Sequence, residues 1–137
     1  MSTTSTAGAD CILVVDDDQA IRETLVEVLE EGGCHAVGAA NGAQAMDLLE
    51  RQPRDRRTCL ILLDLMMPVM DGPTFRQEQL RKADLADIPV VVITAFQDAA
   101  ANQGSMNATE ILIKPLQITD IMRVAKQFCE CGASSSP

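Results

Sequence analysis

The chain has few basic residues, a single histidine and no long apolar run. Its 137 residues include 11 Lys and Arg against 20 Asp and Glu, so the formal net charge is −9. An acidic chain is repelled by nucleic acid and by anionic lipid, and neither is expected as a partner. No apolar stretch is long enough to span a bilayer, and residues 2–10 lack the basic and apolar regions of a signal peptide. We therefore expect a cytoplasmic protein that does not bind a membrane.

Sulfur and nitrogen ligands for zinc are also scarce. The chain has five cysteines, and three of them, Cys11, Cys34 and Cys59, lie at the starts of strand-like runs. A reduced thiol there behaves as a small buried hydrophobe. Cys129 and Cys131 are close in sequence, but with one histidine in the chain a zinc site would be short of ligands. We expect reduced, buried cysteines and no zinc.

The apolar content is sufficient for one core. Hydrophobic residues make up 47% of the sequence, and a chain of this length is large enough for one domain but not for two. We expect residues 11–130 to form this domain. The tails at 1–10 and 131–137 are rich in small and polar residues and are expected to be disordered.

Short apolar runs alternate with segments of helical periodicity along the domain. This alternation predicts an α/β fold in which crossover helices cover both faces of a parallel sheet. Strands are expected at 11–15, 34–39, 59–63, 89–93 and 111–113. Helices are expected at 19–31, 42–52, 72–80, 97–107 and 117–128, and the fourth is the weakest because it is rich in Ala, Gln and Asn and contains a glycine.

Individual residues mark the ends and the buried faces of these helices. Asp18 is expected to cap the first helix, Asn41 with Gln44 the second, and Asp71 the third. The apolar positions expected to face the core are Ala45, Leu48 and Leu49 in the second helix, Phe75 and Leu80 in the third, and Ile118, Ile121, Met122, Ala125 and Phe128 in the last.

Polar side chains follow four of the predicted strands. Asp16 and Asp17 come after the first strand, Asp64 after the third, Thr94 after the fourth and Lys114 after the fifth. Since parallel strands end at the same edge of a sheet, we expect these side chains in one crevice. Clustered carboxylates repel one another, and a hard cation with oxygen ligands relieves that repulsion. A hydroxyl and an ammonium group bind phosphoryl oxygens, so the sequence predicts a magnesium and phosphoryl site.

The motifs around these positions together resemble a known family. They are VVDDD at 14–18, LLDLMMP at 62–68 followed by MDG at 70–72, ITA at 93–95 and IKP at 113–115. From about Cys11 to Phe128 the chain resembles the response-regulator receiver domain of two-component signalling, either stand-alone or excised from a longer regulator. The resemblance implies a doubly wound, flavodoxin-like sheet of five parallel strands in the order 2-1-3-4-5, with five helices of which the fourth is short or weak.

The resemblance also implies a role for each site residue. Asp64 would be the phosphoacceptor, Lys114 would pair with the phosphoryl group, and Thr94 would turn its hydroxyl toward it. Pro115 would shape the loop at Lys114 through a cis peptide bond. Mg²⁺ would be held by oxygen atoms of Asp16, Asp17, Asp64 and the backbone carbonyl of Met66.

The implied function is signalling rather than turnover of a separate substrate. The domain would take a phosphoryl group from a histidine kinase or phosphotransfer protein, and would catalyse only its own phosphorylation and dephosphorylation. Phosphorylation would shift the surface of the fourth helix and fifth strand between two packings, and an unidentified effector protein would recognise the result. Ile111 lies where the family usually has Tyr or Phe, so a rotating ring is not expected to report the change.

Two other functions share part of this pattern. A haloacid-dehalogenase-like, Mg²⁺-dependent phosphatase also uses an aspartyl nucleophile, and Asp16-x-Asp18 matches the D-x-D of that family. However, Gln19 and Ala20 do not continue its motif. A pseudo-receiver would keep the fold as a binding module without being phosphorylated, but this chain has all of the site residues.

Overall fold

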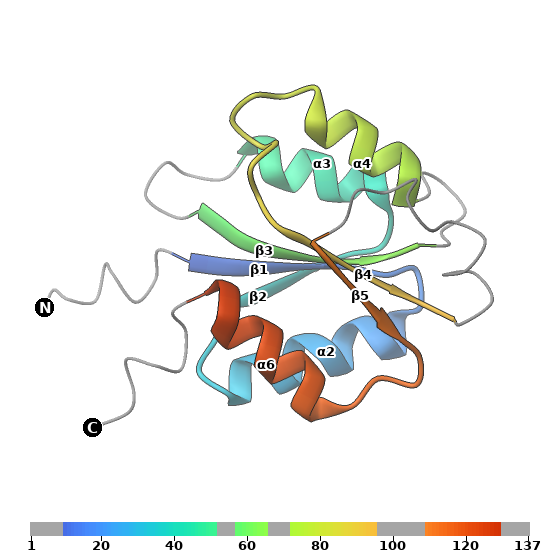
Figure 1. Ribbon diagram of the computed structural model, residues 1–137, viewed down its shortest axis with the longest axis vertical. Helices are drawn as coiled ribbons and strands as arrows, with labels where there is room; N and C mark the ends of the chain where they lie inside the picture. The colour runs from blue at the N-terminus through green and yellow to red at the C-terminus, as the bar shows by residue number, and fades with distance from the viewer. Residues whose placement is uncertain (1–9, 52–56, 66–71, 96–108, 130–137) are drawn as a thin grey trace, which may run out of the picture.

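Figure 1 shows the computed structural model of the protein, which describes residues 10–51, 57–65, 72–95 and 109–129. The strands are β1 (Asp10–Val15), β2 (Ala36–Ala39), β3 (Arg57–Asp64), β4 (Val90–Thr94) and β5 (Glu110–Ile113). The helices in the described ranges are α2 (Gln19–Glu31), α3 (Gly42–Arg51), α4 (Gly72–Leu80) and α6 (Ile118–Phe128). The helix expected at 97–107, the cap expected at Asp71 and the tails at 1–9 and 131–137 lie outside the described residues.

The five strands form one parallel sheet in the order β2-β1-β3-β4-β5, which confirms the predicted flavodoxin-like topology. Helices α3 and α4 cover one face of the sheet, and α2 and α6 cover the other (Figure 1). From β1 the chain adds β2 on one side and then β3 on the other, so the direction of strand order reverses at β1. Doubly wound sheets bind their ligands outside the carboxyl ends of the strands at such a reversal, so the topology directs attention to the ends of β1 and β3.

The central strands are buried on both faces, because successive side chains of a strand point to opposite sides. The strand residues Leu13, Val15, Ile61, Leu63, Val90 and Val92 pack with residues of α3 and α4. The alternate residues Ile12, Val14, Leu60, Leu62, Val91 and Ile93 pack with α2 and α6. This two-sided burial explains why these strands are continuous apolar runs rather than alternating ones.

Two helices begin at the residues predicted from the sequence. The Asp18 carboxylate accepts a hydrogen bond from the Ile21 amide at 3.1 Å, so Asp18 caps α2. The Asn41 side chain accepts one from the Gln44 amide at 2.8 Å, and the Gln44 side chain accepts one from the Ala40 amide at 2.8 Å. Among the helices that the structure describes, none is long and apolar enough to cross a membrane.

Three residues expected in the core are exposed instead. Leu48 is 39% exposed because Met46, rather than Leu48, shares the inner face of α3 with Ala45 and Leu49. Leu80 is 44% exposed. The neighbouring Gln79 is fully buried in its place, because its amide donates to the carbonyls of Leu85 and Ile88 at 2.8 and 3.0 Å. Ile118, in the first turn of α6, is 64% exposed.

The expectation of reduced cysteines was wrong for Cys34, Cys59 and Cys129. Cys59 and Cys129 form a disulfide across a sequence separation of 70, with their Cα atoms 5.6 Å apart. Helix α6 runs back along the sheet, so its carboxyl end reaches the start of β3, and the two Cα atoms fall within the usual range for a disulfide. Cys34 is also disulfide-bonded. Cys11 is a buried thiol whose Sγ atom lies 3.7 Å from the Ile12 carbonyl oxygen.

Candidate functional site

Backbone hydrogen bonds at the carboxyl edge of the sheet align the loops that follow the strands. The Asp16 amide donates to the Ala39 carbonyl at 3.1 Å, and the Lys114 amide donates to the Thr94 carbonyl at 2.8 Å. The five side chains predicted from strand ends come together there, as expected. They line a cavity of about 260 Å³, whose walls are Asp16, Asp17, Asp18, Ile21, Asp64, Thr94, Ala95 and Lys114.

Three carboxylates form the acidic wall of this cavity. Asp16, Asp17 and Asp64 each offer one oxygen, and these three oxygens lie within 4.8 Å of one another. Asp16 and Asp64 are 2% and 5% exposed, whereas Asp17 is open to solvent. Two buried carboxylates and a third acid at this separation repel one another strongly unless a cation or a proton intervenes.

Asp16 is the most buried of the three acids. Burial raises the pKa of the Asp16 carboxyl above its ordinary value of 3.8. The hydrogen bond from the Asp18 amide and the charge of Lys114 lower this pKa, and the charge of Asp17 raises it. The Asp18 amide binds Oδ1 at 2.9 Å. The other oxygen, Oδ2, is buried and has no hydrogen-bond partner within the described part of the chain.

Thr94 and Lys114 also line the cavity. Thr94 is 2% exposed, and its Oγ1 has no hydrogen-bond partner among the described residues. The Nζ atom of Lys114 lies 3.9 Å from Oδ1 of Asp64. The Lys114–Pro115 peptide bond is cis, which confirms the sequence prediction.

The donor set fits a hard divalent cation. All three acids offer oxygen atoms, and a buried oxygen of Asp16 lacks a partner within the described residues. A buried polar atom without a partner is costly, and a cation bound at Oδ2 would remove that cost. Mg²⁺ typically uses one or two protein carboxylates with further oxygen ligands, which this cluster can supply. Met66, whose carbonyl was expected to contribute, lies outside the described residues.

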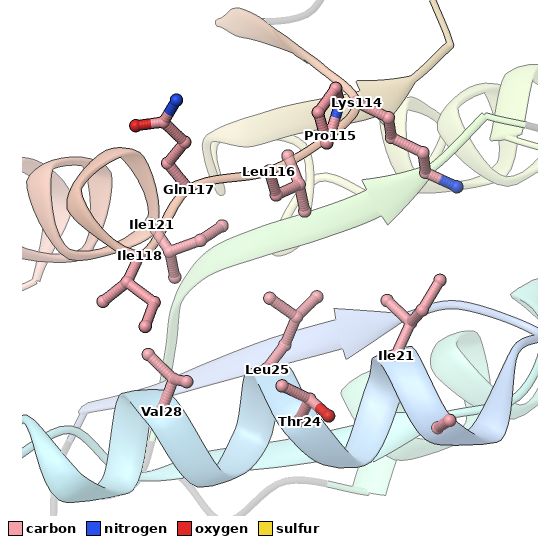
Figure 2. Close-up of a pocket in the computed structure, with 11 residues that line it drawn as sticks. Ile21, Thr24, Leu25, Val28, Lys114, Pro115, Leu116, Gln117, Ile118 and Ile121 are labelled. Atoms are coloured by element: carbon pink, nitrogen blue, oxygen red, sulfur yellow. The ribbon is translucent and has the colours of Figure 1, made fainter.

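An apolar groove opens beside the acidic cavity, and the sequence reasoning did not find it. Figure 2 shows this groove of about 410 Å³ between α2 and the segment that leads from Lys114 into α6. Its lining includes Ile21, Leu25 and Val28 of α2 and Ile118 and Ile121 of α6. Apolar helical positions usually indicate core, so the periodicity of α2 and α6 gave no sign of a groove. Two residues, Ile21 and Lys114, line both the groove and the acidic cavity.

A family model, the response regulator receiver domain, matches residues 12–126. The chain is 35% identical over 121 residues to sporulation initiation phosphotransferase F of Bacillus subtilis, and the match spans 85% of this chain and 91% of that protein. It is 34% identical to the response regulator receiver protein CpdR of Brucella abortus, across 81% of this chain and 89% of that one. Against the transcriptional regulator ycf27 of Porphyridium aerugineum, the match spans 76% of this chain but 41% of the relative.

Solved structures agree in fold. The response regulator TrrA of Thermotoga maritima, determined in complex with Mg²⁺-BeF, has a TM-score of 0.73 and 28% identity, over 87% of this chain and 98% of that one. A CheY-like receiver domain protein of Methanospirillum hungatei has a TM-score of 0.75 and 27% identity, over 88% and 94% of the two chains.

The flavodoxin-like sheet and these matches define a phosphoacceptor signalling domain. The chain belongs to the response regulator receiver family of two-component signalling. Receiver domains are signalling domains and not enzymes that turn over a separate substrate. None of the matches described here favours a dehalogenase-like phosphatase or a pseudo-receiver.

Proposed function

We propose that Asp64 accepts a phosphoryl group from a phosphohistidine on a histidine kinase or phosphotransfer protein. The observation that supports this most strongly is the position of Asp64 itself. Its carboxylate lies at the end of β3 and 3.9 Å from the Lys114 ammonium, and its side chain is 7% exposed. A carboxylate beside a fixed positive charge is suited to nucleophilic attack on phosphorus, because the ammonium stabilises the charge that develops on the phosphoryl oxygens.

The chemical step is a transfer between two protein side chains. A carboxylate oxygen of Asp64 attacks phosphorus and forms an acyl phosphate. The phosphorus–nitrogen bond to the imidazole breaks, and the nitrogen keeps the electron pair. Lys114 binds a phosphoryl oxygen, and the Thr94 hydroxyl, whose oxygen is buried without a partner in the described residues, donates a hydrogen bond to another. The same residues make the domain the catalyst of its own phosphorylation and dephosphorylation.

Mg²⁺ belongs to this proposal as a cofactor. Asp16, Asp17 and Asp64, with the Met66 carbonyl implied by the family resemblance, would hold it. When bound, the cation would neutralise the acids and the phosphoryl oxygens. The Thermotoga relative was determined with Mg²⁺-BeF, which supports a similar requirement here.

The apolar groove is the surface that we assign to the phosphodonor protein. The groove is continuous with the acidic cavity through Ile21 and Lys114, so a helix seated on it brings its side chains to the mouth of the site. Its lining is mainly aliphatic, and Ile118 at its rim is 64% exposed. Such a surface fits the apolar face of an amphipathic helix, which is a common way for proteins to recognise helices.

We assign the output surface to the edge of the sheet that β5 forms. Thr94 is in register with Ile113 of β5, so a hydroxyl drawn toward a phosphoryl group pulls on the strand pair β4–β5. Ile111 and Ile113 are each 39% exposed on β5. We propose that phosphorylation changes the surface of β5 and of the predicted fourth helix, which lies outside the described residues, and that a downstream effector protein recognises this change.

The test uses a small phosphodonor, so that it does not depend on an identified partner. Wild-type protein, Asp64→Asn and Asp47→Asn are incubated with acetyl phosphate and Mg²⁺ and weighed intact by mass spectrometry. Asp47 is an exposed carboxylate on α3, paired with Arg51, and serves as the matched control. Wild type and Asp47→Asn are expected to gain one phosphoryl mass, and Asp64→Asn none. A phosphoryl gain by Asp64→Asn would overturn the assignment.

A further inference from the structure

An arginine of α2 holds the loop that contains the acids. Arg22 lies one helical turn after the cap Asp18, and its backbone amide donates to the Asp18 carbonyl at 2.9 Å. Its guanidinium Nη1 reaches back and donates to the backbone carbonyl of Asp16 at 2.8 Å. The arginine is half-buried, so this hydrogen bond between a charged donor and a carbonyl is partly shielded from water.

A glycine in the neighbouring strand makes room for that side chain. Gly38 lies within the edge strand β2 and is in register with Val14 of β1. A Cβ atom on Gly38 would lie 2.8 Å from Cγ and 2.9 Å from Cδ of Arg22. Glycine weakens a strand and often marks the close approach of another group. Here the approaching group is the aliphatic stem of Arg22, which crosses the strand at this point.

The carbonyl held by Arg22 belongs to the peptide that joins Asp16 to Asp17. The peptide unit is planar, so fixing its oxygen also fixes the direction in which the chain continues to the Cα atom of Asp17. The Asp17 side chain is exposed, and its oxygen nevertheless lies within 4.8 Å of those of Asp16 and Asp64. Mutating a group that orients a metal ligand from outside the first layer typically lowers metal affinity by about 10- to 100-fold.

We propose that Arg22 is a positioning residue for the divalent-cation site, and that the absence of a side chain at Gly38 leaves the space through which Arg22 reaches Asp16. The inference rests on the proposed function, because it takes Asp16, Asp17 and Asp64 as the Mg²⁺ ligands. The direction of the change in Mg²⁺ affinity distinguishes a positioning role from a purely electrostatic one. Removing a positive charge near a cation site would by Coulomb's law strengthen Mg²⁺ binding, whereas losing the positioning contact weakens it.

The experiment measures Mg²⁺ affinity directly by isothermal titration calorimetry, without phosphodonor. Arg22→Ala and Gly38→Ala are expected to raise the Mg²⁺ dissociation constant about tenfold, in the range found for residues that orient metal ligands. Arg22→Lys keeps a charged donor that can reach the carbonyl but loses the planar fork of arginine, so it is expected to weaken Mg²⁺ binding by no more than about threefold. The double variant Arg22→Ala/Gly38→Ala is expected to bind Mg²⁺ no more weakly than Arg22→Ala alone, because both substitutions remove the same contact with the Asp16 carbonyl.

Gly32→Ala is the matched control for the glycine substitution. A Cβ atom on Gly32 would meet the flexible end of the Met122 side chain, which can move aside, at the carboxyl end of α2 and away from the acids. Gly32→Ala is expected to leave the Mg²⁺ dissociation constant unchanged. If Arg22→Ala and Gly38→Ala bind Mg²⁺ as wild type does, or if Gly32→Ala weakens binding equally, the positioning role is overturned. Failure of the wild type itself to bind Mg²⁺ would overturn the proposed cation site together with it.

Discussion

The Lys114 ammonium lies 3.9 Å from Oδ1 of Asp64, a separation too long for a hydrogen bond but short enough for a strong charge interaction. Lys114 is 34% exposed at its side chain and Asp64 is 7% exposed, so the pair spans the boundary between solvent and the buried end of β3. Under the proposed function, this position would let the lysine attract an incoming phosphoryl group from solvent and follow it to the aspartate.

Replacing this lysine should slow phosphorylation without changing where it occurs. Lys114→Gln removes the charge that stabilises the developing phosphoryl oxygens, and we expect the rate with acetyl phosphate to fall about 100-fold, as for loss of one preorganised donor. The rate is followed by intact-mass spectrometry at saturating Mg²⁺. Lys126→Gln, an exposed position on α6, is the control and should react as wild type does. A Lys114→Gln rate within twofold of wild type would contradict the role.

The raised pKa of Asp16 predicts a defined dependence of stability on pH. Since the folded state holds the proton of Asp16 above the ordinary pKa of 3.8, the folded state binds more protons than the unfolded chain in that window. Stability contributed by Asp16 is thus fully present below pH 3.8 and is lost as the pH rises through the folded pKa. Asp16→Asn lacks this loss, so at neutral pH without Mg²⁺ it should be more stable than wild type.

Adding Mg²⁺ should reverse that order. The cation binds only the folded acids and stabilises wild type by mass action, by about 1 to 3 kcal/mol well above its dissociation constant. Asp16→Asn should gain much less. Urea denaturation across a pH series, with and without Mg²⁺, measures both effects. A wild type that is more stable than Asp16→Asn without Mg²⁺ would contradict the predicted cost of burying the Asp16 charge.

The disulfide between Cys59 and Cys129 should add substantially to stability. It closes a loop of large sequence separation, 70 residues, which restricts the unfolded chain. We expect Cys59→Ala/Cys129→Ala to be less stable than oxidised wild type by about 2 to 4 kcal/mol in urea denaturation. In a thiol reductant the two proteins should become nearly equal, since neither then has the bond. A difference that persists unchanged in reductant would assign it to side-chain packing.

The groove predicts a selective defect in transfer between proteins. Ile118→Glu places a charge at the apolar rim, which is 64% exposed. We expect phosphoryl transfer from a phosphohistidine-containing phosphotransfer protein to slow by at least about fivefold, because the introduced charge would have to lose water when an apolar partner surface docks on it. The rate with acetyl phosphate should not change. Leu80→Glu alters an exposed leucine on α4, which covers the other face of the sheet, and is the matched control. Equal transfer rates for the two variants would exclude the groove as the docking surface.

The residues at the strand ends could be predicted from the sequence because each follows an apolar run, and parallel strands end at one edge. Other features depend on contacts between distant elements. The proximity of Cys59 and Cys129 follows from the path of α6 along the sheet, and the contact of Arg22 with Gly38 follows from how α2 packs against β2. Gln79 is buried because two carbonyls outside its helix accept its amide, and no helical period indicates those partners.

The most direct measurement is the location of the phosphoryl group within the chain. Protein phosphorylated with acetyl phosphate and Mg²⁺ is reduced with borohydride, which converts an aspartyl phosphate to homoserine, and is then digested and sequenced by tandem mass spectrometry. Homoserine at position 64, and none at positions 16 or 17, is the predicted result. Homoserine at position 16 or 17, or a phosphoryl group on another residue with position 64 still aspartate, would contradict the assignment of Asp64 as the phosphoacceptor.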